Sequence, residues 1–175
     1  MATITIVFTV HNEQGLCNQA ELVRILREID PEVIFEELRP LDFAEMYQES
    51  ARHTLEMKAI IEFRNEKPVE QVPVDHFEMK EGLAADINKL LSYAERSHTE
   101  YGEFTDKEDW CAYHFGFEFL CSAEFKALNA QTHKALSDAV DQSKDEAING
   151  LLQDWNQRWR MRERSMVENI YKYSE

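Results

Sequence analysis

Residues 4–40 read ITIVFTVHNEQGLCNQAELVRILREIDPEVIFEELRP, and the predicted fold is built outward from this stretch. Ile4–Val10 is a β-branched and aromatic run, too short and too continuous for an amphipathic helix, which predicts a strand buried on both faces. Asn18 then caps a helix that ends at Pro31, and Val33–Phe35 predict a second strand. A strand, a crossover helix and a second strand predict parallel pairing with a right-handed connection.

The next part of the chain extends this predicted core. Residues 43–64 carry an uninterrupted helical pattern, and Val72–Val74 predict a short third strand. That strand is expected at a sheet edge because Pro73 lacks the N–H that a central ladder needs. We therefore predict an α/β fold with a small parallel sheet built from βαβ units.

Beyond about residue 79 the pattern is helical. We expect a loop over the polar residues 97–109 and a break near Ser143, followed by one long helix. The predicted organisation is a single domain over residues 1–175. It divides into a strand–helix–strand core (1–78), a large helical insertion (79–143) and a long C-terminal helix (144–175).

Two helical patterns carry extra information. One places a set of bulky residues on a single helix face, which is typical of a core and less often of a ligand or partner surface: Trp110, Tyr113, Phe117, Leu120 and Cys121. The other is an apolar seam in the C-terminal helix, interrupted by Arg162. An inward-pointing guanidinium is costly to bury alone, so Arg162 is expected to meet a carboxylate or a bound anion.

Composition excludes several function classes. The chain has 34 Asp and Glu against 19 Lys and Arg, a net charge of −15, which argues against a nucleic-acid partner. No apolar run approaches the length of a membrane span, and no leader sequence precedes the first predicted strand, so we expect no membrane partner and a cytoplasmic location. Three cysteines without CxxC spacing indicate neither a disulfide framework nor a zinc ribbon.

Polar residues follow each predicted strand. His11 follows the first, Glu36 and Glu37 end the second, and Asp75 follows the third. In open parallel sheets, chemistry collects beyond the carboxyl ends of the strands. These side chains are therefore candidates for a functional site.

Four segments in order resemble a known superfamily: TVHN (9–12), PEVIFEEL (31–38), VPVD (72–75) and RERSMVENI (162–170). The chain resembles the TraB/Tiki, ChaN and erythromycin-esterase-like superfamily over its first 75 residues and its last 15 or so. The superfamily's first glycine is replaced by Phe8 or Thr9. Its second histidine motif, expected after the arginine helix, is missing here.

The resemblance implies a divergent or truncated metal-dependent hydrolase, esterase-like or peptidase-like, acting on a small molecule or a peptide. His11 would be a metal ligand or general base, Glu37 a ligand or base, and Arg162 an anchor for a substrate carboxylate or an oxyanion. The set His11, Glu37 and Asp75 would hold Mn²⁺ or Zn²⁺. Taken from the residues alone, His11 is more typical of a structural histidine, and Arg162 of a structural ion pair.

The alternative is a non-enzymatic binding or assembly protein that keeps half of the hydrolase fold. A small sheet with an unpaired edge is covered by a partner chain or by another copy. On this hypothesis we expect a homo-oligomer or a partner chain that completes the sheet. Residues 110–120 would supply an aromatic contact surface.

Overall fold

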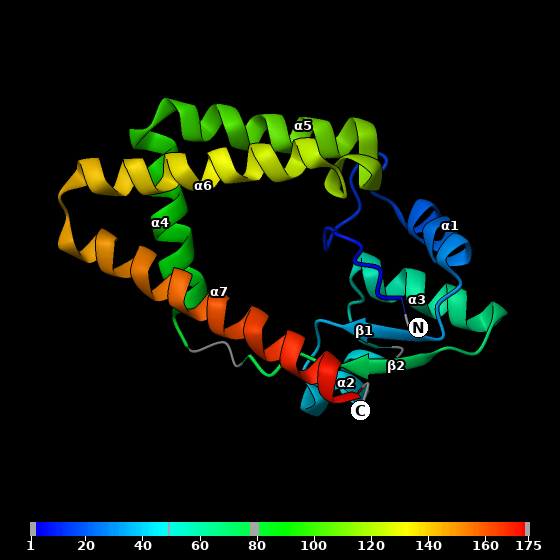
Figure 1. Cartoon of the computed structure of the whole chain (residues 1–175). Coiled ribbons are helices and arrows are strands. Elements are labelled where there is room, and N and C mark those ends of the chain that lie inside the picture. Colours follow the sequence, from blue (N-terminus) through cyan, green and yellow to red (C-terminus); the bar gives the residue numbers. More distant parts are fainter. Residues whose placement is uncertain (1–2, 49, 78–80, 174–175) are drawn as a thin grey trace. The chain divides into compact units, whose positions relative to one another are not determined.

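The computed structural model describes residues 3–48, 50–77 and 81–173, which contain mostly helix and one small sheet (Figure 1). The elements, in chain order, are α1 (Gln19–Ile29), β1 (Val33–Glu36), α2 (Pro40–Met46), α3 (Leu55–Glu66), β2 (Glu70–Pro73), α4 (Leu83–Ser97), α5 (Thr99–Leu120), α6 (Ala123–Ser143) and α7 (Glu146–Tyr173). The predicted mixed α/β character and the long C-terminal helix are confirmed.

The chain divides into two compact units. Unit 1 comprises Met1–Val74 and Asp109–Lys126, and unit 2 comprises Asp75–Glu108 and Ala127–Glu175. Each unit is therefore assembled from two separate stretches of sequence.

The sheet lies in unit 1 and pairs β1 with β2 in parallel. Val33 stands opposite Glu70 and Glu36 opposite Pro73, and a further hydrogen bond joins Val74 N–H to the Glu36 carbonyl at 3.0 Å. Two of the predicted strands, at 33–35 and 72–74, are thus confirmed with small changes at their ends. Because α2 and α3 separate these strands in sequence, the parallel connection runs through helices.

The predicted strand over Ile4–Val10 is wrong, since β1 and β2 are the only strands in the described residues. The side chains of Ile6 and Phe8 are more than half exposed instead of buried on both faces. This segment is held by the start of α3: the Leu55 N–H donates to the His11 carbonyl at 2.9 Å. The segment has the β-branched and aromatic residues that strands favour, but a strand also needs a neighbouring strand with which to form hydrogen bonds.

Helix boundaries follow their local signals in some places only. Asn18 caps α1 by accepting from the Glu21 N–H at 3.0 Å, and α6 ends at Ser143, both as predicted. The helix predicted over 43–64 is instead two helices, because Thr54 starts α3 as a new N-cap. The loop predicted over residues 97–109 is wrong, since Ser97 ends α4, His98 alone separates the two helices and residues 99–109 form the start of α5.

Each unit has its own apolar core. In unit 1, α1 packs against α3, and the buried residues of the two helices are Leu22, Val23, Leu26, Leu55, Met57, Ala59, Ile60 and Phe63. In unit 2, helices α4 to α7 contribute a cluster of Leu90, Ala94, Tyr101, Ala135, Leu136, Ala139, Val140, Ile148 and Leu152.

The two stretches of unit 1 meet where the turn before α1 crosses α5. The Leu16 N–H donates to the Tyr113 carbonyl at 2.9 Å. Gly116 departs from helical geometry (φ 61°, ψ −144°), which kinks α5 directly after this point. Gly15, with φ of 53°, lies so close that a Cβ there would stand 2.0 Å from the Tyr113 oxygen. Only glycine fits this crossing.

We predict that Gly15→Ala lowers the free energy of unfolding by about 3 kcal/mol or more, because it adds a backbone clash to the strain of a positive φ. Gly82→Ala is the matched control: its φ is 84°, but a Cβ there meets nothing within 4 Å. The control should lose only about 1–2 kcal/mol of stability, the cost of a positive φ for a residue with a Cβ. Urea unfolding followed by circular dichroism measures the free energy of unfolding of both variants. Equal losses in the two would contradict the close approach of Gly15 to Tyr113.

Candidate functional site

The structure places His11 beside a carboxylate that was not predicted. Its Nδ1 lies 3.0 Å from Glu56 Oε1, and the Thr9 hydroxyl donates to the same oxygen at 2.7 Å. The His11 side chain is largely exposed, whereas that of Glu56 is mostly covered. Glu56 thus binds the N-terminal segment to the first turn of α3.

Hydrogen bonding controls the ionisation of Glu56. Burial alone raises its pKa, but hydrogen bonds, from His11 above all and also from Thr9, outweigh burial and lower the pKa to about 2. The carboxylate is therefore charged throughout the physiological range. No local pattern in the sequence identifies Glu56, because its partner His11 lies 45 residues away in the chain.

Arg162 and Asp75 form the second pair, inside unit 2. Arg162 Nε and Nη2 both lie 2.8 Å from Asp75 Oδ2, and the side chains are 15% and 7% exposed. The guanidinium also stacks over the Trp159 ring, at 4.8 Å from its centroid. The expectation that Arg162 meets a carboxylate is confirmed by its pairing with Asp75.

The two glutamates at the end of β1 differ in environment. Glu36 is buried and accepts hydrogen bonds from the Tyr47 hydroxyl and, at 2.6 Å, from Gln71 Nε2, whereas Glu37 is exposed. Burial raises the pKa of Glu36 against the effect of these hydrogen bonds. Glu36 is therefore the buried residue of the pair, whereas the superfamily resemblance singles out Glu37.

The predicted metal ligands are divided between the units: His11 and Glu37 belong to unit 1 and Asp75 to unit 2. Among the described residues, no three His, Cys, Asp or Glu side chains are grouped to hold a metal ion. The metal-site hypothesis stays a prediction.

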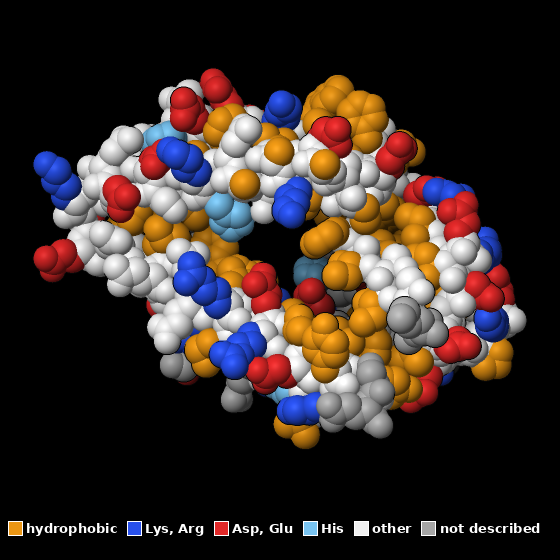
Figure 2. All heavy atoms as spheres, viewed as in Figure 1, with side chains coloured by type: hydrophobic (Ala, Val, Ile, Leu, Met, Phe, Trp, Pro, Cys, Tyr) orange, Lys and Arg blue, Asp and Glu red, His pale blue; other side chains and the backbone are white. Residues whose placement is uncertain are grey.

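The most conspicuous surface feature of unit 1 is an aromatic patch on α5, made of Trp110, Tyr113, His114 and Phe115. The Trp110, Tyr113 and Phe115 side chains are 55%, 54% and 53% exposed. Trp110 stacks on His114 at 4.2 Å between ring centroids and meets Phe115 edge-on at 5.7 Å. Figure 2 shows hydrophobic side chains gathered over this end of α5, at the top of the view.

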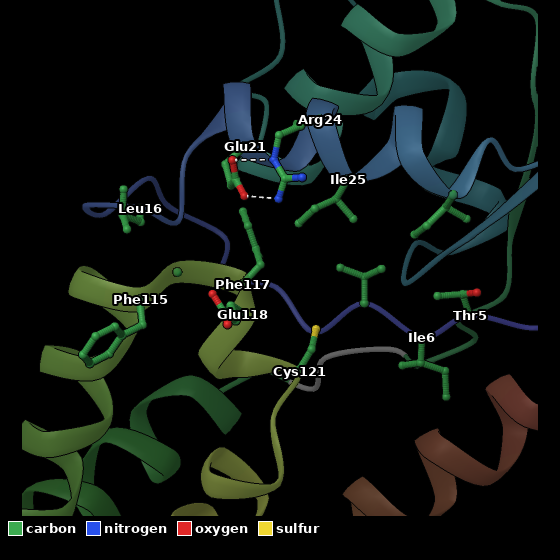
Figure 3. A pocket seen from close by; sticks show the side chains of 13 residues that line it. Thr5, Ile6, Leu16, Glu21, Arg24, Ile25, Phe115, Phe117, Glu118 and Cys121 are labelled. Atoms are coloured by element: carbon green, nitrogen blue, oxygen red, sulfur yellow. Dashed lines mark hydrogen bonds and ion pairs between the residues drawn. The ribbon is translucent and has the colours of Figure 1, made fainter.

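The kink at Gly116 explains why the aromatic face does not form as predicted. Phe117 and Leu120, which follow the kink, are buried, whereas Trp110 and Tyr113, which precede it, are exposed. Figure 3 shows Phe117 reaching toward α1 while Phe115 points away from it. Helical spacing relates residues only within an unbroken helix, so one predicted face became two.

A groove of about 470 Å³ adjoins the patch within unit 1 (Figure 3). Its wall comes from the N-terminal segment, α1 and the end of α5, and includes Leu16 and Phe115. Leu16 is itself 52% exposed. Patch and groove together form a continuous, mainly apolar surface, and the charged residues on it include the ion-paired Glu21 and Arg24.

Comparison with known proteins finds no matching family model, no matching curated protein and no matching solved structure. In the described part of the chain, no helix combines the length and the apolar character that crossing a membrane requires.

We predict that Glu56→Gln lowers the free energy of unfolding by about 2 kcal/mol at pH 7. The pKa of Glu56 is depressed from 4.5 to about 2 on folding, so its stabilisation is complete above about pH 4.5 and is lost as pH falls toward 2. The difference between variant and wild type should therefore shrink over that range in urea unfolding. Glu45→Gln, at an exposed residue, serves as the control. A difference in stability between Glu56→Gln and wild type that did not change with pH would contradict the lowered pKa of Glu56.

Arg162→Met should cost about 3 kcal/mol, because it leaves the Asp75 carboxylate covered and without its arginine. Adding Asp75→Asn to this variant should restore part of the loss. Thermal melting of the single and double variants measures both effects. A single variant as stable as wild type would show that the pair does not hold α7 in place.

Proposed function

We propose that this chain is a non-enzymatic binding and assembly protein, and that the aromatic patch is its contact surface. The single observation that carries the proposal is the exposure of Trp110, Tyr113 and Phe115 by more than half each, side by side on one end of α5. Isolated exposed apolar residues are ordinary, but a contiguous aromatic group is typical of an interface.

The residue types support this role. Tryptophan and tyrosine bury much area while losing little conformational freedom, and they dominate the binding energy of many interfaces. The patch also stands on a rigid base, because the Leu16–Tyr113 hydrogen bond anchors the helix at the patch itself. A fixed backbone lowers the entropic cost of binding.

The hydrolase hypothesis has weaker support. The candidate residues His11, Asp75 and Arg162 are engaged in hydrogen-bonded pairs that tie segments of the fold together, a structural role that accounts for them. As part of the proposal, we take β1, α2, α3 and β2 as the βαβ-like unit kept from the superfamily that the chain resembles. On this view the chain keeps part of the hydrolase fold, but its function is binding instead of hydrolysis.

The proposal predicts that a photo-reactive benzoylphenylalanine in place of Phe115 forms a covalent adduct with protein in extracts of cells that express the chain. The adduct should disappear when excess wild-type chain competes, and persist when the competitor carries Trp110→Ser and Tyr113→Ser. The same probe at Leu41, which is 91% exposed on α2, is the matched control. Probes that behave alike at residues 115 and 41 would overturn the proposal.

A further inference from the structure

We infer that the aromatic patch binds the outward face of α7 from a second copy of this chain. The inference rests on the proposed function and names the partner of that same surface. It is carried by two surfaces: an aromatic patch on an acidic stretch of α5, and an apolar stripe with exposed arginines on α7.

The sequence around the patch is acidic. Unit 1 carries 17 Asp and Glu against eight Lys and Arg. Helix α5 itself has six acidic residues and a single lysine. Asp109 adjoins Trp110 in sequence, and Glu118 lines the groove beside Phe115. A complementary partner is therefore basic as well as apolar.

Helix α7 has two distinct faces. Trp155, Arg162 and Asn169 lie seven residues apart on its more covered face. The opposite face carries Arg160, Arg164, Val167 and Tyr171, whose spacing of four, three and four places them on one stripe. All four are exposed, and Met161 beside them is 63% exposed. This stripe combines apolar side chains with arginines, and the exposed Glu163 and Glu168 flank it, the latter paired with Arg164.

This part of α7 is also the most basic stretch of the sequence. Residues 158–172 contain five Arg and Lys against two Glu, within a chain whose net charge is −15. Arg162 points inward to Asp75 and Arg158 pairs with Asp154, so Arg160 and Arg164 are the arginines that the stripe offers to the patch. The match between α5 of one copy and α7 of another is heterologous, so association closes into a ring or dimer, or continues as a longer chain.

Multi-angle light scattering of the purified chain tests the inference. We expect a molar mass above that of the 20.6 kDa monomer that rises with protein concentration. A patch variant (Trp110→Ser with Phe115→Ser) and a helix variant (Arg164→Glu with Tyr171→Ser) should each raise the dissociation constant at least tenfold. Circular dichroism checks that both remain folded.

Mixing the two variants is the decisive measurement. The intact α7 of the patch variant meets the intact α5 of the helix variant, so the mixture should regain a heterodimer that neither variant forms alone. Lys134→Glu is the matched control for charge reversal. Like Arg164 it is highly exposed and paired with a carboxylate four residues on, and its reversal should leave association unchanged.

Other outcomes overturn the inference in distinguishable ways. A purified chain that stays monomeric while the Phe115 probe still labels another protein refutes self-association and leaves the proposed function standing. A dimer lost in the patch variant but kept in the helix variant indicates a patch-to-patch contact instead. A monomer together with probes that do not differ between residues 115 and 41 refutes both proposals.

Discussion

The hydrogen bond from the Leu16 N–H to the Tyr113 carbonyl is the constraint on which unit 1 depends. It joins the turn before α1 to the interior of α5, two segments far apart in sequence. Glycine is required on both sides of the crossing, since a Cβ at Gly15 or at Gly116 would stand within 3 Å of the opposing segment. The same kink that admits the turn also sends Phe117 into the core and leaves Tyr113 on the surface. Packing and surface chemistry thus have one geometric cause.

The polar residues described above mainly join separate segments of the chain through hydrogen bonds and ion pairs. Glu56 gathers Thr9 and His11 onto α3, and Asp75 receives both Nε and Nη2 of Arg162. Mostly covered charges are tolerated because each has a close partner of opposite or donating character. The residue types that suggest chemistry, histidine and carboxylate at the ends of segments, serve equally well to fasten those segments. A catalytic role and a structural role are distinguished by what each side chain contacts, and the structure shows those contacts.

An acidic chain that associates must do so through local complementarity. At a net charge of −15, two copies repel each other at long range, and this opposes indiscriminate contact. In the self-association that we infer, short-range attraction between the aromatic patch of one copy and the arginine-bearing face of α7 of another works against that repulsion only when the two are correctly oriented. On that proposal, repulsion favours a specific and reversible contact over aggregation.

Local rules in the sequence determined several features of this protein. The cap at Asn18, the break at Ser143 and the strands around Val33–Glu36 and Glu70–Pro73 depend on a few neighbouring residues, so their patterns predict them. The inward position of Arg162 followed from heptad spacing alone. Only the tertiary structure decided that Ile4–Val10 forms no strand, because a ladder needs a partner that composition does not name. It likewise decided that the aromatic run of α5 is half core and half surface. That division arises from a kink at Gly116 held by a residue far away in the chain, and helical periodicity contains no information about such a contact.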